Sequence, residues 1–148
     1  MELTGEDLNF FSEFERIVRV MPRDYYLSDS LLVFLVDLKY LGKAIGKKGS
    51  NIPKLRSVFR KNVVILGDSP DPEIFLGSMF NNVKIFSIEV LDVMNEKNII
   101  FTVDEKDRGI AIGKNGERIK SAKEFLKRKF NAKLILKTKR VLSFESSQ

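Results

Sequence analysis

The chain has 148 residues, of which 43% are hydrophobic and 31% charged, and its net charge is +6. It contains no cysteine and no histidine, which excludes disulfides, thiolate metal sites and the commonest general base. No apolar run approaches the ~18 residues of a membrane helix, and the N-terminus lacks the basic start of a secretory signal, so we expect no membrane contact. The composition therefore predicts a globular, cytoplasmic binding protein without a cofactor, and not an enzyme.

A helix and two strands are predicted first along the chain. Thr4 and Asp7 have the spacing of a capping box at a helix start. The expected apolar face of this helix consists of Leu8, Phe11, Phe14, Ile17 and Val18. A short strand is expected near 25–27, and the β-branched and aromatic stretch 31–37 predicts a longer one.

Two helices separated by a Gly-x-x-Gly segment are predicted next. A short helix can begin at Asp37 and end at Gly46. A second helix follows the segment, and Pro53 is tolerated there because it falls in the first turn, where its missing N–H has no partner to lose. The expected apolar face of this helix consists of Ile52, Leu55, Val58 and Phe59. A strand at 62–66 follows.

The second half of the chain repeats this order of elements. Asp71, Pro72 and Glu73 supply a helix cap, a proline at the first position and an acid in the first turn. The expected apolar face of this helix is Ile74, Phe75, Met79 and Phe80. Two strands are predicted after it, at 83–92 and 98–104, with a turn near Asn95 between them. A short helix ending at Gly113 follows, then a longer helix and a strand at 131–136. The expected apolar face of the longer helix is Ile119, Ala122, Phe125 and Leu126. This last helix is expected to be about two residues longer than its counterpart.

The turn-rich stretch 67–70 separates the two halves. We therefore predict one domain at 1–67, a second at 71–140 and a polar tail at 141–148. Because the stretch is short, the two domains are not expected to tumble freely.

The two halves also repeat in sequence. Segments 42–52 and 109–119 lie 67 positions apart and are identical at seven of eleven positions. Over the longer pair 31–52 and 98–119, eleven of 22 positions are identical. A repeat of this length predicts two copies of one small unit.

Positive charge is concentrated around the repeat. Residues 38–61 contain eight Lys or Arg and no Asp or Glu, and residues 105–140 contain thirteen Lys or Arg and four acids. These stretches carry +8 and +9, so the remainder of the chain is acidic. Basic surface on an acidic body is typical of proteins that bind polyanions, although solvated helix faces can also be rich in lysine.

Each Gly-x-x-Gly segment is suited to contact with a sugar-phosphate chain. Glycine has no Cβ, so a phosphate can approach the backbone closely, and the helix that follows presents its positive N-terminal end at the same place. The loop lysines add charge, Asn115 offers hydrogen bonds, and the flanking isoleucines can line a groove for unstacked bases. The candidate nucleic-acid-binding residues are Gly46, Lys47, Lys48 and Gly49 of the first segment, Gly113, Lys114, Asn115 and Gly116 of the second, the flanking Ile45, Ile52, Ile112 and Ile119, and, in second rank, Lys43, Lys54, Arg118 and Lys120.

The two segments do not fit other glycine-rich motifs. A P-loop requires Gly-x-x-x-x-Gly-Lys-Ser/Thr, and neither segment has that spacing. A tight turn between two helices with no ligand remains open, as does a purely structural role for Ile45 and Ile112. No pair of carboxylates and no nucleophile with a base forms a catalytic pattern.

The stretches 45–52 and 112–119 both resemble the Ile-Gly-x-x-Gly-x-x-Ile signature of KH domains. The order of elements, with a helix first and a strand last, resembles the prokaryotic (type II) arrangement. The resemblance implies an α+β fold of two tandem KH domains, each a three-stranded sheet packed by helices. It also implies that each Gly-x-x-Gly loop clamps single-stranded RNA.

More narrowly, the chain resembles the archaeal NusA-like transcription factors. They share its size, the repeated Gly-x-Ala-Ile-Gly-Lys and an Asp-Pro-Glu-x-Phe segment, here at 71–75. The resemblance implies a factor in transcription termination or antitermination that binds single-stranded RNA. It implies contact with RNA polymerase less directly, since the chain has no room for the polymerase-binding and S1 domains of bacterial NusA. We expect a monomer.

Two other functions are compatible with the sequence. A KH protein of ribosome assembly or RNA processing would use the same loops. A scaffold whose acidic part binds other proteins would not need them.

Overall fold

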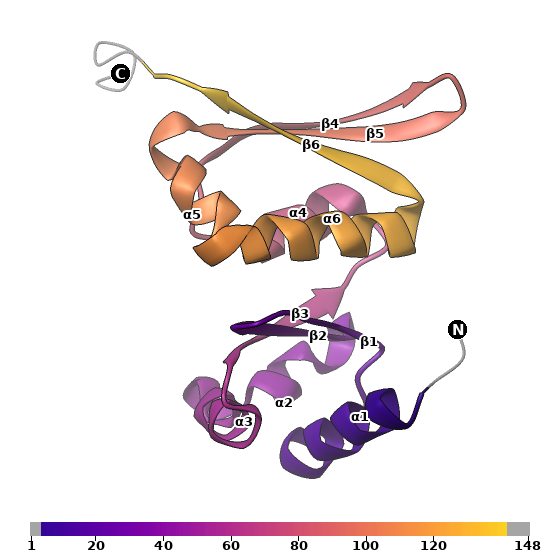
Figure 1. The fold of residues 1–148 in the computed structure, drawn as a ribbon, viewed down its shortest axis with the longest axis vertical. Coiled ribbons are helices and arrows are strands. Elements are labelled where there is room, and N and C mark those ends of the chain that lie inside the picture. The colour runs from indigo at the N-terminus through magenta and orange to yellow at the C-terminus, as the bar shows by residue number, and fades with distance from the viewer. Residues whose placement is uncertain (1–3, 142–148) are drawn as a thin grey trace. The chain divides into compact units, whose positions relative to one another are not determined.

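Two three-stranded sheets, β1-β2-β3 and β4-β5-β6, organise the chain (Figure 1). The computed structural model describes residues 4–141. Each sheet belongs to one of two compact units, Met1–Ser69 and Pro70–Gln148. Of the predicted tail 141–148, only Val141 is among the described residues.

The first unit begins with a helix and ends with a strand. Its elements are α1 (Gly5–Val18), β1 (Asp24–Leu27), β2 (Leu31–Asp37), the 3₁₀ turn η1 (Leu38–Tyr40), α2 (Leu41–Ile45), the 3₁₀ turn η2 (Lys47–Gly49), α3 (Asn51–Phe59) and β3 (Asn62–Asp68). Thr4 caps α1, and its side chain and that of Asp7 exchange hydrogen bonds with each other's backbone N–H, which confirms the predicted capping box.

The second unit has the same order of elements. They are α4 (Pro72–Met79), β4 (Ile85–Val93), β5 (Glu96–Asp104), η3 (Glu105–Asp107), α5 (Arg108–Ile112), η4 (Lys114–Gly116), α6 (Glu117–Phe130) and β6 (Ala132–Lys139). Asp71 caps α4 as predicted, and its carboxylate accepts the backbone N–H of Glu73. Helix α6 has 14 residues and α3 has nine, so the two differ by more than the predicted two residues.

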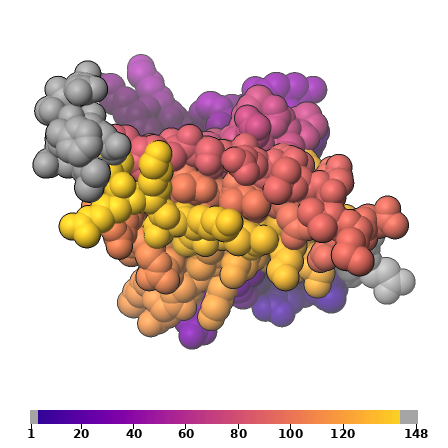
Figure 2. Space-filling model, turned by 90° about the horizontal axis from the view of Figure 1, so that it is seen from above, coloured from indigo at the N-terminus to yellow at the C-terminus, as the bar shows by residue number. Residues whose placement is uncertain are grey.

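Strand pairing is also the same in the two sheets. The middle strand pairs antiparallel with the strand before it and parallel with the strand after it, as β2 does with β1 and β3, and β5 with β4 and β6. In each unit the helices lie on one face of the sheet (Figure 1). Figure 2 views the other face of the second sheet, where β6 (yellow) runs beside the salmon strands of the β4–β5 hairpin. The predicted α+β class, with three-stranded sheets packed by helices, is confirmed.

Aromatic side chains fill the space between sheet and helices. In the first unit, the ring centroids of Phe14 on α1 and Phe34 on β2 are 4.2 Å apart, and both side chains are fully buried. In the second unit, Phe80 and Phe101 lie 4.9 Å apart and are also fully buried. Each sheet therefore has its own apolar layer against its helices.

Three residues assigned to apolar helix faces proved to be exposed. Leu8, Val58 and Ile74 are 51%, 43% and 56% exposed. Leu8 and Val58 lie at the margin of the apolar stripe of their helices, where spacing alone does not decide burial. Ile74 lies on the side of α4 that faces away from the buried Leu76 and Met79. Within residues 4–141, no helix has the length and hydropathy of a membrane span.

Candidate nucleic-acid interface

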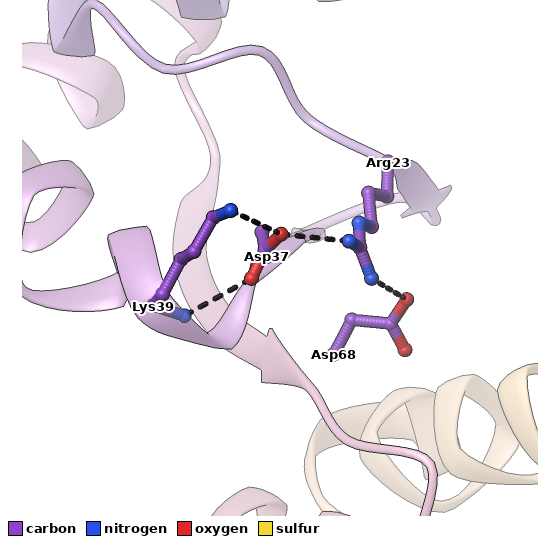
Figure 3. Close-up of polar contacts among 4 residues, drawn as sticks. All are labelled: Arg23, Asp37, Lys39 and Asp68. Carbon is purple, nitrogen blue, oxygen red and sulfur yellow. Dashed lines mark hydrogen bonds and ion pairs between the residues drawn. The ribbon is translucent and has the colours of Figure 1, made fainter.

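In each unit an aspartate begins the helical segment that leads to the Gly-x-x-Gly loop. In the first unit the Asp37 carboxylate accepts the backbone N–H of Lys39 at 3.1 Å. Arg23, just before β1, donates to Asp37 at 2.7 Å and to Asp68 at 3.3 Å (Figure 3). These contacts join the C-terminal ends of β2 and β3, so the point at which the chain leaves the sheet for the loop is fixed.

The second unit fixes the same point with other contacts. The buried carboxylate of Asp104 accepts the backbone N–H of Lys106 at 3.1 Å. The backbone N–H of Asp104 donates to the Lys84 carbonyl at 2.9 Å, and the Lys84 N–H donates to the Asp107 carboxylate at 2.9 Å. Lys84, directly before β4, therefore holds the segment that is equivalent to the one held by Arg23 in the first unit.

The first glycine of each loop has a backbone conformation that only glycine adopts readily. Gly46 has φ 83° and ψ 167°, and Gly113 has φ 78° and ψ 175°. A Cβ on Gly113 would lie 2.6 Å from Cβ and 3.1 Å from the backbone nitrogen of Arg118. A Cβ on Gly46 would lie 2.7 Å from Oγ of Ser50. The first glycine is therefore required for the loop to close on the helix that follows.

The other half of each loop is left-handed and open. Lys48 (φ 56°, ψ 30°) and Asn115 (φ 54°, ψ 23°) occupy the same position and the same region. The second glycines, Gly49 and Gly116, have φ 71° and 72°. A Cβ on Gly49 would meet nothing within 4 Å, and one on Gly116 would meet only the end of the Lys120 side chain at 3.7 Å. The backbone here has open space in front of it, as a phosphate requires.

A polar side chain on the following helix ties each loop to the helix before it. Asn51 on α3 donates from Nδ2 to the carbonyl of Ala44 at 2.9 Å, and to that of Lys43 at 3.4 Å. Arg118 occupies the equivalent position on α6 and donates to the carbonyl of Ile110 at 3.1 Å. In both units, therefore, a side chain at this position connects the helix after the loop with the helix before it. Asn51 is not among the residues predicted from the sequence, although a polar residue precedes the last isoleucine in both copies.

Arg118 makes further contacts within the second unit. Its Nη2 donates to the Met79 carbonyl at 2.9 Å and to the Asn82 side-chain oxygen at 2.6 Å, and its guanidinium lies over the Phe80 ring at 4.9 Å. Burial lowers the pKa of Arg118 from its usual value, because desolvation penalises the charged form. Arg118 was predicted as a second-rank RNA contact, but the structure directs its guanidinium to acceptors of the protein.

We expect Arg118→Ala to lower the free energy of unfolding of the second unit by about 2–3 kcal/mol, since a charged donor to several acceptors is lost. Urea unfolding, with hydrogen exchange of the α6 amides to isolate this unit, measures the change. Arg108→Ala, an exposed arginine on α5, is the control and should stay within about 0.5 kcal/mol of the parent. Equal effects of the two changes would show that Arg118 has no anchoring role.

The remaining predicted residues fall into two groups. The side chains of the loop lysines are exposed, as are Asn115 and the second-rank lysines: Lys47, Lys48, Lys114, Lys43, Lys54 and Lys120. The isoleucines lie deeper: Ile45 and Ile52 are half-buried and pack against the first core, Ile112 is half-buried, and Ile119 is only 8% exposed. Ile119 therefore belongs to the core, whereas the other three retain some open surface.

No cluster of three or more carboxylates that could hold a metal ion occurs in the part of the chain described here. The arrangement at each loop is instead a backbone with positive φ angles, open space in front of it and lysines around it. Such a site can bind an anionic chain by hydrogen bonds from the main chain and by charge.

Comparison with known proteins agrees with this geometry. Residues 78–145 match the KH domain family. A protein of Halobacterium salinarum named "Probable transcription termination protein NusA" is 27% identical over 132 residues, covering 88% of this chain and 94% of that protein. A protein of the same name from Methanocaldococcus jannaschii is 29% identical over 128 residues, covering 86% and 70%.

A solved structure described as "Crystal structure of APE1850" aligns with a TM-score of 0.73 and 32% sequence identity. It covers 93% of this chain and 100% of that one. The chain therefore contains a KH domain in its second unit. Across most of its length it is homologous to the archaeal NusA-like proteins.

Proposed function

We propose that this protein binds single-stranded RNA with both units, each acting as a KH domain whose Gly-x-x-Gly loop clamps the RNA backbone. The observation that carries the proposal is the identity of the two loops in backbone conformation. The φ and ψ angles of Gly46 agree with those of Gly113 within about 10°, and those of Lys48 agree with those of Asn115 within the same range. In both loops the space in front of the second glycine is open, so a phosphate can approach the backbone there.

The first unit enters the proposal by its likeness to the second. It has the same order of elements and the same strand pairing, and a side chain at the equivalent position of the following helix donates a hydrogen bond to the helix before the loop. Its loop carries two lysines, whereas the second loop carries Lys114 and Asn115. We therefore expect the first loop to depend more on charge and the second more on hydrogen bonding.

The clamp would work through the backbone and the lysines together. A phosphate beside Gly49 or Gly116 can approach main-chain N–H groups without meeting a side chain. The positive end of the α6 helix lies directly after Gly116, and it favours the same anion. The exposed surface of Ile45, Ile52 or Ile112 offers apolar contact to an unstacked base.

The relatives named for transcription termination favour a role in transcription over one in ribosome assembly or RNA processing. We propose that the protein acts in termination or antitermination, by binding alone and without catalysis, and that RNA polymerase is a partner. Affinity purification from the source cells tests this part: recovery of polymerase subunits supports it, and recovery of pre-ribosomal particles instead would contradict it.

RNA binding itself is tested by fluorescence anisotropy with a labelled mixed-sequence single-stranded RNA at several salt concentrations. We expect log K to fall with log salt, with the loops alone contributing a slope of about −2, because each neutralised phosphate of a single strand contributes about −0.7 and three loop lysines are available. A duplex DNA of the same length serves as the comparison and should bind more weakly, because its bases are not free to enter the groove. Absence of binding to single-stranded RNA at moderate salt would overturn the proposal.

A further inference from the structure

The second unit contains a cavity of about 400 Å³ that lies away from its Gly-x-x-Gly loop. The loop precedes the first residue of α6, whereas the cavity is lined by the later part of that helix, the start of β6 and the turn of the β4–β5 hairpin. Its charged lining residues are Lys123, Lys127, Lys133 and Glu96. With three ammonium groups and one carboxylate, the cavity is net positive and suited to an anion.

The three lysines are available to a ligand. Within residues 4–141, no ion pair or hydrogen bond engages the side chain of any of them. The acid of this part of α6, Glu124, is occupied by Arg128, with 3.1 Å between Oε1 and Nε. All three lysines are exposed, so binding an anion would break no existing contact.

A row of lysines connects the loop with this cavity. Lys120, Lys123 and Lys127 are spaced i, i+3 and i+7 along α6, so they lie on one face of the helix. The opposite side of α6 is occupied by buried Ala122 and Phe125. From Gly116 to Lys127 the row spans roughly 17 Å, at about 1.5 Å for each residue. The row therefore places lysines along one face of α6 between the clamp and the cavity.

Stabilisation of the helix alone does not explain this charge. A lysine in the last turn, such as Lys127, interacts favourably with the negative end of the helix dipole. Lys123 lies a turn earlier, and Lys133 lies on β6. The same dipole repels an anion at this end of α6, so the lysines themselves must supply the attraction.

The hairpin turn beside the cavity favours a nucleotide over a small inorganic anion. Asn95 lines the cavity, and the preceding residue, Met94, is 94% exposed at the tip of the turn with φ 52°. Val93 next to it is 51% exposed. An apolar surface beside a cationic cavity offers contact to a base on one side and to a phosphate on the other.

We propose that the row Lys120–Lys123–Lys127 and the cavity with Lys133 bind backbone phosphates of the same RNA strand, beyond the nucleotides clamped by the Gly113–Gly116 loop. This inference rests on the proposed RNA-binding function. It makes the site on the second unit longer than the four nucleotides that one KH loop clamps.

The test compares a tetranucleotide with a dodecanucleotide RNA, using the full chain with Lys47→Asp and Lys48→Asp to disable the first loop. In this background, Lys123→Gln with Lys127→Gln should weaken dodecamer binding about tenfold and make the salt slope shallower by about 1.4, or about 0.7 for each lost phosphate contact. Tetramer affinity should change by less than about twofold, because the clamp is untouched.

The matched control is Lys137→Gln with Lys139→Gln, which removes two exposed charges from β6 outside the cavity. It should leave the salt slope for the dodecamer unchanged. If the two double variants weaken the dodecamer equally, only general electrostatics acts and the inference fails. If inorganic pyrophosphate removes the length-dependent part of binding as effectively as unlabelled dodecamer does, the cavity is a site for a free anion, and the inference also fails. If not even the parent binds either RNA, the proposed function itself fails.

Discussion

Single-stranded RNA binding is expected to fall at least a hundredfold when Lys47, Lys48, Lys114 and Asn115 are all replaced by Asp. The change reverses the charge at both loops and takes the net charge of the chain from +6 to −1. It should not disturb the loops, because Lys48 and Asn115 have left-handed backbones and aspartate tolerates that region better than most residues. Anisotropy with labelled RNA measures the loss, and circular dichroism checks that the variant is folded.

A control variant separates the loops from general charge. Arg19, Arg60 and Lys137 are exposed and lie outside both loops, and replacing them by Asp moves the net charge by nearly as much. Arg19 and Arg60 also have positive φ, so an aspartate at either position must adopt a left-handed backbone, as it must in place of Lys48. We expect this variant to lose less than about tenfold in affinity. If it binds as poorly as the loop variant, the loops are not the site.

Gly113→Ala should have the largest effect of any alanine substitution in the second loop. The residue has φ 78° and ψ 175°, a region used almost solely by glycine, and the new Cβ would lie 2.6 Å from Cβ of Arg118 and 3.1 Å from its backbone nitrogen. We expect a loss of about 3 kcal/mol in the free energy of unfolding of the second unit, from backbone strain and displacement of the start of α6. Thermal and urea unfolding measure this loss, and RNA affinity should fall with it.

Two other glycines provide matched comparisons for this substitution. Gly109 lies within α5 with open space around its Cβ position, so Gly109→Ala should be neutral or stabilise by up to about 1 kcal/mol. At Gly46 the new Cβ would meet only side-chain atoms, Oγ of Ser50 at 2.7 Å and Nδ2 of Asn51 at 3.0 Å, whereas at Gly113 it would meet Cβ and backbone atoms of Arg118, so Gly46→Ala should cost less than Gly113→Ala. An effect of Gly113→Ala no larger than that of Gly109→Ala would refute the steric argument.

The architecture could be predicted because its signals are local. The capping box at Thr4, the cap at Asp71 and the turn at Asn95 each depend on a few neighbouring residues, and the structure contains all three. The repeat added the order of elements, since a pattern found twice is less ambiguous than one found once. Spacing failed at Leu8 and Val58, because the width of a buried stripe depends on what packs against the helix. Ile74 is exposed because it does not share a helix face with the buried Leu76 and Met79.

The features of the candidate site that could not be predicted are contacts between distant residues. In the sequence Arg118 is one of several basic residues near a loop. Its hydrogen bond to the carbonyl of Met79 exists only because α4 and α6 pack together. The left-handed backbone at Lys48 could not be foreseen either, since lysine has no preference for it. The cavity beside Lys133 unites a helix, a strand and a hairpin turn, and no local pattern marks it.

The position of β6 at the edge of its sheet gives its lysines a second importance. An edge strand offers unpaired backbone groups to any other extended chain, and charged side chains along it are a common protection against such pairing. Lys133, Lys137 and Lys139 are exposed along β6. Removing these charges would therefore favour edge-to-edge aggregation of the protein at high concentration, independently of any effect on its ligand.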